Sequence, residues 1–144
     1  MKHQKLHKIS IMAILGLEKS FIERNYTFLN CKIENGILYC YGSYQPCEFS
    51  VKYDYRIKYN GLSKPNVQIR SPKIGYDDNI HMYPNDNSLC LFHSSDLVWS
   101  SKSHLFDTII PWTHEWFVFY EIYKITGKWE HPFVPHINGE KKDV

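Results

Sequence analysis

The chain has 144 residues and a formal net charge of +2, with 17 basic residues against 15 acidic ones. A chain of this length fits one domain with a sizeable core, so we treat residues 1–144 as a single domain. The even charge balance argues against a surface that follows phosphate groups, and we therefore expect neither nucleic acid nor a membrane as a partner. No segment approaches the roughly 20 consecutive apolar residues that a membrane span needs.

The first predicted element is a helix over residues 9–24, where apolar side chains recur at loosely helical spacing. Basic residues precede this apolar run, as they do in a signal peptide. Glu18 and Lys19 interrupt the run, however, and no small-residue cleavage site follows it. We therefore favour a first amphipathic helix over a signal peptide.

Four antiparallel strands are predicted next. Residues 27–36 end in the turn Glu34-Asn35-Gly36, and residues 37–44 follow it; Asn-Gly is a dipeptide typical of tight hairpin turns. A further turn at Asn60-Gly61 leads into a fourth strand over residues 65–72, which Pro72 closes. The third strand is predicted within residues 48–61, because apolar residues alternate there with polar ones, at Phe49, Val51, Tyr53, Tyr55, Ile57 and Tyr59.

Residues 73–100 are rich in Asp, Asn and Ser, and so long a loop in a small domain is usually functional. Helical spacing returns from Ser103, with Pro111 expected in the first turn of a long helix that Gly127 ends. The polar tail over residues 137–144 is expected to be flexible. The aromatic stripe of the long helix is expected to be core, at Trp112, Trp116, Phe119, Tyr120 and Tyr123.

These elements predict an α+β fold: an N-terminal helix, a four-strand antiparallel meander, a long loop carrying the candidate site, and a C-terminal helix packed on the single sheet.

The four cysteines contain no C-x-x-C pair, so neither a structural zinc site nor a disulfide framework is indicated, and a reducing cytoplasm fits best. Cys31, Cys40 and Cys47 lie on or beside predicted strands and are expected to be structural. Cys90 is different, because it follows the polar residues 81–88 and lies between two leucines. From the residues alone it is either a small core residue or a presented nucleophile.

A presented thiolate at Cys90 would be a strong nucleophile and a good leaving group, which suits transient carriage of an acyl group. An amine attacking the thioester creates an oxyanion, and the amides of Asn85 and Asn87 are candidate donors to it. His81 could shape the loop by hydrogen bonding or take part in acid–base chemistry. A competing interpretation is a zinc site, although its spacing matches no common zinc pattern, with ligands His81, Cys90, His93 and His104.

The segment "PNVQIRSP...IHMYPNDNSLCLF...W" resembles the active-site region of ubiquitin-conjugating enzymes. Those proteins have a helix, a four-strand meander and a His-Pro-Asn loop, followed by the acceptor cysteine, a leucine and a tryptophan. Here His81 precedes Cys90 by nine residues and Trp99 follows it by nine. The Pro-Asn pair is displaced by two residues, which leaves three candidates for the residue that supports the oxyanion: Tyr83, Asn85 and Asn87.

With its terminal "TGKWEHPFVPH", the chain looks closer to bacterial members of the superfamily, encoded in CBASS antiphage operons. The resemblance implies that Cys90 takes up a C-terminal carboxyl group as a thioester and passes it to a lysine amine, with no metal or organic cofactor. The expected partner is a nucleotidyltransferase similar to cyclic GMP-AMP synthase, whose C-terminus is conjugated like ubiquitin. No ATP-binding loop motif occurs, so adenylation would need a separate activating enzyme, or the acyl group would arrive by another route.

The alternative function is a catalytically inactive binding module of the same fold, like variant ubiquitin-conjugating proteins that lack the cysteine. The presence of Cys90 within the motif favours the enzyme. His136 lies in the terminal segment, where we expect a solvated histidine. Three further residues are candidates for flanking the thioester and orienting the incoming lysine: His93, Asp96 and Asp107.

Overall fold

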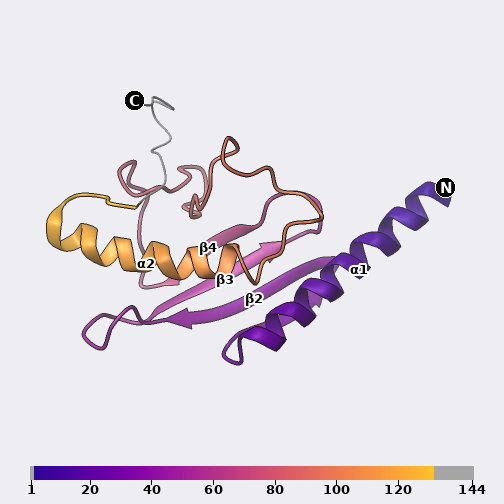
Figure 1. Ribbon diagram of the computed structural model, residues 1–144, viewed down its shortest axis with the longest axis horizontal. Coiled ribbons are helices and arrows are strands. Elements are labelled where there is room, and N and C mark those ends of the chain that lie inside the picture. Colours follow the sequence, from indigo (N-terminus) through magenta and orange to yellow (C-terminus); the bar gives the residue numbers. More distant parts are fainter. Residues whose placement is uncertain (1, 132–144) are drawn as a thin grey trace.

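The computed structural model describes residues 2–131 and confirms the predicted order of helix, four-strand sheet and helix (Figure 1). The sheet is an antiparallel meander in the order β1-β2-β3-β4. The predicted tail over residues 137–144 and His136 lie outside the described residues. The helices and strands are α1 (Lys2–Asn25), β1 (Asn30–Glu34), β2 (Ile37–Tyr44), β3 (Tyr53–Tyr59), β4 (Asn66–Ser71) and α2 (Ile109–Thr126).

The two predicted turns fix the strand register. Asn35 and Gly36 have φ values of 52° and 74°, the left-handed conformation that a two-residue hairpin turn of this kind requires. In the turn between β3 and β4, the Asn60 side-chain oxygen accepts hydrogen bonds from the backbone N–H groups of Leu62 (2.8 Å) and Ser63 (2.9 Å). Both turns therefore form where the sequence predicts them.

The third strand is shorter than predicted, because β3 begins at Tyr53. Phe49 is 90% exposed and Val51 is 51% exposed, although both continue the alternating pattern. The pattern outruns the strand because β2 ends at Tyr44, which pairs with Tyr53, so earlier residues have no β2 partner. Cys47, expected from the sequence to be structural, lies in the same connection and is exposed, so it contributes nothing to the buried core.

One face of the sheet is apolar and carries the core. Its aromatic side chains meet α2: the ring of Tyr53 stacks on Phe117 at 4.5 Å, and the Tyr55 hydroxyl lies 2.7 Å from Nε2 of His114. Gly42 on β2 permits this packing, because a Cβ atom there would lie 2.9 Å from the Tyr55 ring. The buried side chains of both helices join this face in one core.

The second helix follows its sequence signals closely. Pro111 is its third residue. Gly127 ends the helix with a φ of 76°, and its backbone N–H donates a hydrogen bond to the Tyr123 carbonyl (2.8 Å). Within the aromatic stripe Trp116 is fully buried, while the other members are half-buried. Of these, Trp112, Tyr120 and Tyr123 pack against the core, and Phe119 contacts His131 with ring centres 5.0 Å apart.

The first helix begins at Lys2, seven residues earlier than the apolar pattern suggests. Its contact with the segment before α2 depends on Glu18, which is 2% exposed. The Glu18 carboxylate accepts hydrogen bonds from the Leu105 backbone N–H (2.8 Å) and from Nδ1 of His104 (2.6 Å). No helix of the described chain is both long and apolar enough to cross a membrane.

Candidate functional site

Residues 82–89 form a short hairpin that lies against β4, and Cys90 follows it directly. Met82 and Leu89 form an isolated antiparallel bridge, and the Leu89 N–H bonds to the Val67 carbonyl of β4 (2.9 Å). Asn87 closes the hairpin in a left-handed conformation (φ 59°), which asparagine tolerates better than most residues. The hairpin therefore anchors the cysteine to the edge of the sheet.

Asp86 holds the shape of the 82–89 hairpin. Its carboxylate accepts hydrogen bonds from the backbone N–H (2.9 Å) and the hydroxyl (2.6 Å) of Ser88, and from the side-chain amide of Asn66 on β4 (3.0 Å). Partial burial alone would raise the pKa of Asp86, but these donors favour the charged form and lower the pKa below its usual value. The carboxylate thus remains ionised while it holds the hairpin to β4.

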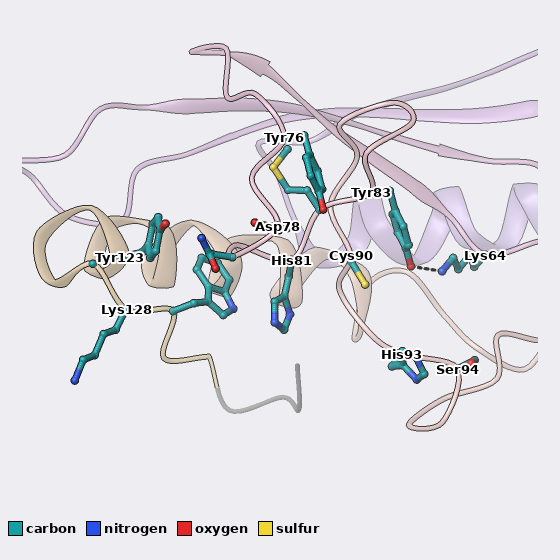
Figure 2. A pocket seen from close by; sticks show the side chains of 14 residues that line it. Lys64, Tyr76, Asp78, His81, Tyr83, Cys90, His93, Ser94, Tyr123 and Lys128 are labelled. Atoms are coloured by element: carbon teal, nitrogen blue, oxygen red, sulfur yellow. Dashed lines mark hydrogen bonds between the residues drawn. The ribbon is translucent and has the colours of Figure 1, made fainter. Parts of the chain in front are cut away.

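The Cys90 sulfur lies at a pocket of about 820 Å³ (Figure 2). The cysteine is only 5% exposed, and its thiol donates a hydrogen bond to the Phe92 carbonyl (3.6 Å). The side chain is therefore both part of the core boundary and part of the pocket wall. The polar and aromatic residues lining the pocket include Lys64, Asn79, His81, Tyr83, His93 and Trp129.

Tyr83 and Lys64 form a polar pair beside the sulfur. The Lys64 ammonium donates a hydrogen bond to the Tyr83 hydroxyl, as the dashed line in Figure 2 shows, and lies 4.4 Å from the centre of the Tyr83 ring. The Tyr83 hydroxyl also lies beside the Cys90 sulfur, and the interaction between them lowers the pKa of the Cys90 thiol (Figure 2). The three side chains therefore form a continuous chain of contacts from a cation to the candidate nucleophile.

Burial and the neighbouring polar groups act in opposite directions on the pKa of Cys90. Burial raises the pKa of the Cys90 thiol, while the Tyr83 hydroxyl and the Lys64 ammonium oppose the rise by stabilising the thiolate. Burial and the neighbouring Cys90 sulfur also raise the pKa of Tyr83. The tyrosine therefore keeps its proton at neutral pH and remains a hydrogen-bond donor.

The backbone carbonyl of His81 joins the cysteine segment to α2. Its carbonyl accepts hydrogen bonds from the Cys90 N–H (2.9 Å) and from the indole N–H of Trp116 on α2 (3.3 Å), and its φ is 56°. Its ring lines the pocket, with its centre 5.6 Å from that of Trp129 and 6.3 Å from that of His131. This residue thus connects the helix, the cysteine and the pocket wall.

The structure brings together only part of the predicted site. Cys90, His81 and Tyr83 line one pocket, whereas Asn85 and Asn87 are exposed in the 82–89 hairpin and do not line it. Of the flanking candidates, His93 lines the pocket, while Asp96 and Asp107 do not.

Several pocket residues are not anticipated from the sequence. Asp78 and Asn79 lie in the polar stretch just before His81, so composition could have suggested them. Lys64 carries no local signal, because it follows the turn between β3 and β4, far from Cys90 in the chain. Trp129 reaches the pocket from beyond the end of α2.

The zinc interpretation gains no support from this arrangement. His81, Cys90 and His93 line the pocket, but Nδ1 of His104 bonds to Glu18 at the first helix. Between residues 2 and 131, no three His, Cys, Asp or Glu side chains are grouped as metal ligands would be.

Comparison with known proteins identifies the family. A search of curated proteins finds no match to this chain. A family model described as Type II CBASS E2 protein matches residues 18–137, which is more than half of the chain and includes every residue of the pocket. The resemblance seen in the Cys90 segment is confirmed at this level: the chain belongs to the Type II CBASS E2 family, the E2-like conjugating proteins of CBASS antiviral defence.

Proposed function

We propose that this protein is an acyl carrier, in which Cys90 takes up the C-terminal carboxyl group of a protein partner as a thioester and passes it to an amine. The observation that carries the proposal is the Lys64–Tyr83–Cys90 chain of contacts at the pocket. A cysteine that only fills space in a core does not require a hydroxyl donor and a cation beside its sulfur. In acyl transfer, both groups stabilise the negative charge that develops on the sulfur and on the carbonyl oxygen.

The expected chemistry assigns a role to each member. When an amine attacks the thioester carbonyl, negative charge develops on the carbonyl oxygen and then on the departing sulfur. The Tyr83 hydroxyl lies beside the sulfur and can donate a hydrogen bond to these charges. The Lys64 ammonium donates to the Tyr83 hydroxyl and so holds it in place. We assign His81 to shaping the pocket wall, and Asn85 and Asn87 to the turn of the hairpin.

The partner we propose is a nucleotidyltransferase similar to cyclic GMP-AMP synthase, whose C-terminus supplies the carboxyl group. The family match supports a protein partner within CBASS. The sequence contains no ATP-binding loop motif, so activation of the carboxyl group falls to a separate activating enzyme or to another acyl donor. We place the reaction in the cytoplasm, where reducing conditions keep the thiol free.

The test is to incubate the protein with a nucleotidyltransferase similar to cyclic GMP-AMP synthase, with an activating enzyme and ATP, and to separate the products on a non-reducing gel. We expect a covalent adduct that thiol reductants release. Cys90→Ala should abolish the adduct, and Cys90→Ser should give an oxyester that resists reductant. Cys47→Ala is the matched control, since Cys47 is exposed and distant in sequence, and should leave the adduct unchanged.

Persistence of the adduct in a folded Cys90→Ala protein, judged by circular dichroism, would refute the proposed role of Cys90. Unfolding of that variant would instead show that the cysteine is structural.

A second candidate is an inactive binding module of the same fold, and the burial of Cys90 favours it. The discriminating measurement is the alkylation rate of Cys90 in the native protein. An enzyme should show a rate that rises with pH and falls in Lys64→Met, because the ammonium favours the thiolate. A Cys90 that reacts only after denaturation would support the binding module.

A further inference from the structure

Two cysteine side chains outside the candidate site lie next to each other on neighbouring strands of the sheet. Cys31 on β1 and Cys40 on β2 are directly opposite in the antiparallel register, and their sulfur atoms lie 3.3 Å apart. Both are free thiols. Opposed residues of antiparallel strands have Cα atoms roughly 4.5–5.5 Å apart, which falls inside the range of about 4.4–6.8 Å that disulfides span. The backbone therefore already has a spacing that a disulfide accepts.

The two thiols differ in accessibility and acidity. Cys31 is half-buried, and its hydrogen bond with Cys40 lowers the pKa of the Cys31 thiol, with a smaller contribution from the Lys19 ammonium in the same direction. Cys40 is fully buried, and the same hydrogen bond together with burial raises its pKa. The pair thus combines an accessible nucleophile with a sheltered thiol that can attack second.

We propose that Cys31 and Cys40 form a reversible disulfide when the protein meets hydrogen peroxide. The Cys31 thiolate attacks a peroxide oxygen, the O–O bond breaks, and the departing hydroxide takes up the proton that the thiol had released. The Cys40 sulfur then attacks the sulfenic sulfur of Cys31, and its own proton leaves with the displaced hydroxyl group as water. In total, two thiols and one peroxide give one disulfide and two water molecules.

The geometry also makes the site selective. The Cys90 thiol is buried, and burial raises its pKa, so peroxide should react with the Cys31–Cys40 pair before it reacts with Cys90. The new bond would join the edge strand β1 to β2, and α1 contacts both strands. A thiol reductant should restore both cysteines.

The experiment treats the purified full chain with increasing hydrogen peroxide, blocks the remaining thiols with iodoacetamide and maps the cross-linked peptides by mass spectrometry. Trypsin cuts after Lys32, between the two cysteines, so a disulfide appears as two linked peptides. Because Cys40 and Cys47 share one tryptic peptide, a Cys47→Ser protein serves as the mapping background. We expect both free thiols to be lost together there, and dithiothreitol to restore them.

Cys31→Ser is the variant that should abolish the link, and its half-buried position makes the substitution mild. In the wild-type protein the exposed Cys47 reports whether the oxidant dose was sufficient. The proposal is overturned if Cys47 is oxidised while Cys31 and Cys40 stay unlinked. It is equally overturned if Cys31 proceeds to sulfinic acid without a bond to Cys40. None of these readouts depends on the proposed conjugating activity.

Discussion

At the scale of single residues, Tyr83 places a hydroxyl between the Lys64 ammonium and the Cys90 sulfur. A tyrosine in this position differs from a side-chain amide, because one oxygen atom both accepts from Lys64 and donates to the reacting group, whereas an amide accepts and donates through different atoms. The accepted bond polarises the O–H and strengthens the donation. Among the three candidates named by the sequence, Tyr83 is the one whose side chain reaches the pocket.

We predict that Tyr83→Phe slows transfer from Cys90 by roughly 100-fold, which is the loss that follows removal of one donor to a developing oxyanion. The ring remains to pack against Lys64, so the fold should be retained. The measurement is single-turnover discharge of a preformed Cys90 thioester to free lysine.

Asn85→Ala is the matched control for Tyr83→Phe, since Asn85 is exposed in the same hairpin and should leave the discharge rate within about twofold. The opposite ranking, with Asn85→Ala slow and Tyr83→Phe fast, would contradict the assignment of the donor.

The residue-level site could be predicted only in part. Cys90 and His81 follow from their spacing and from the resemblance, because a linear motif places both on one segment. Lys64 could not, because it meets Tyr83 only after β4 and the 82–89 hairpin fold against each other. A contact between residues on separate segments, such as Lys64 and Tyr83, gives no periodic pattern in the sequence.

At the scale of elements, α2 is joined to the sheet by His114. Its ring stacks on Tyr44 at 4.2 Å, and burial lowers the pKa of this histidine from 6.5 to about 4. The neutral ring can accept a hydrogen bond from the Tyr55 hydroxyl, 2.7 Å from Nε2. Protonation would therefore cost both desolvation and that bond.

We predict that the free energy of unfolding falls as the pH drops from 6.5 towards 4. In this range the unfolded chain takes up a proton at His114 that the folded protein does not, so acid favours the unfolded state. The full shift corresponds to about 3 kcal/mol, and partial exposure of the ring reduces the expected loss to about 1–2 kcal/mol. Urea unfolding at pH 6.5 and at pH 4.5 measures it.

His114→Gln keeps an acceptor for the Tyr55 hydroxyl but does not titrate, so its stability should depend less on pH across that interval. An unchanged pH dependence in this variant would assign the effect to other groups, such as His131, whose pKa burial also lowers.

The elements themselves are largely predictable from local sequence signals, and the start of β3 shows where such signals are not sufficient. Asn35-Gly36, Asn60-Gly61, Pro111 and Gly127 act locally, through backbone conformation, and each appears where expected. The start of β3 depends instead on where the neighbouring strand ends. Alternation records a potential to form strand, and a hydrogen-bonding partner decides how much of it is realised.

At the scale of the whole molecule, Glu18 joins the first helix to a segment more than eighty residues away in the chain. In the sequence it looks like a polar interruption of an apolar helix, yet in the structure it is 2% exposed and bonds to Leu105 and His104. Sequence periodicity cannot reveal the burial of Glu18, because the sequence does not distinguish a buried glutamate from an exposed one. Only the partners distinguish them.

We predict that Glu18→Ala lowers the free energy of unfolding by about 2–4 kcal/mol, because it leaves the buried Leu105 N–H without its acceptor and opens a cavity. Urea unfolding followed by circular dichroism measures the change.

Glu23→Ala on the same helix is the control, since Glu23 forms an exposed ion pair with Lys19 and should contribute less than about 0.5 kcal/mol. Equal losses in the two variants would show that Glu18 is not a special contact between distant parts of the chain.

The burial of Cys90 has a consequence for the lifetime of anything attached to it. A side chain that is 5% exposed leaves little room for solvent beside the sulfur. Hydrolysis of a thioester needs a water molecule at the carbonyl carbon, and the packed side of Cys90 offers water no approach, so water could arrive only through the pocket. Whatever fills that pocket, such as the protein whose C-terminus is attached, would then decide whether a loaded acyl group meets its amine or is lost to water.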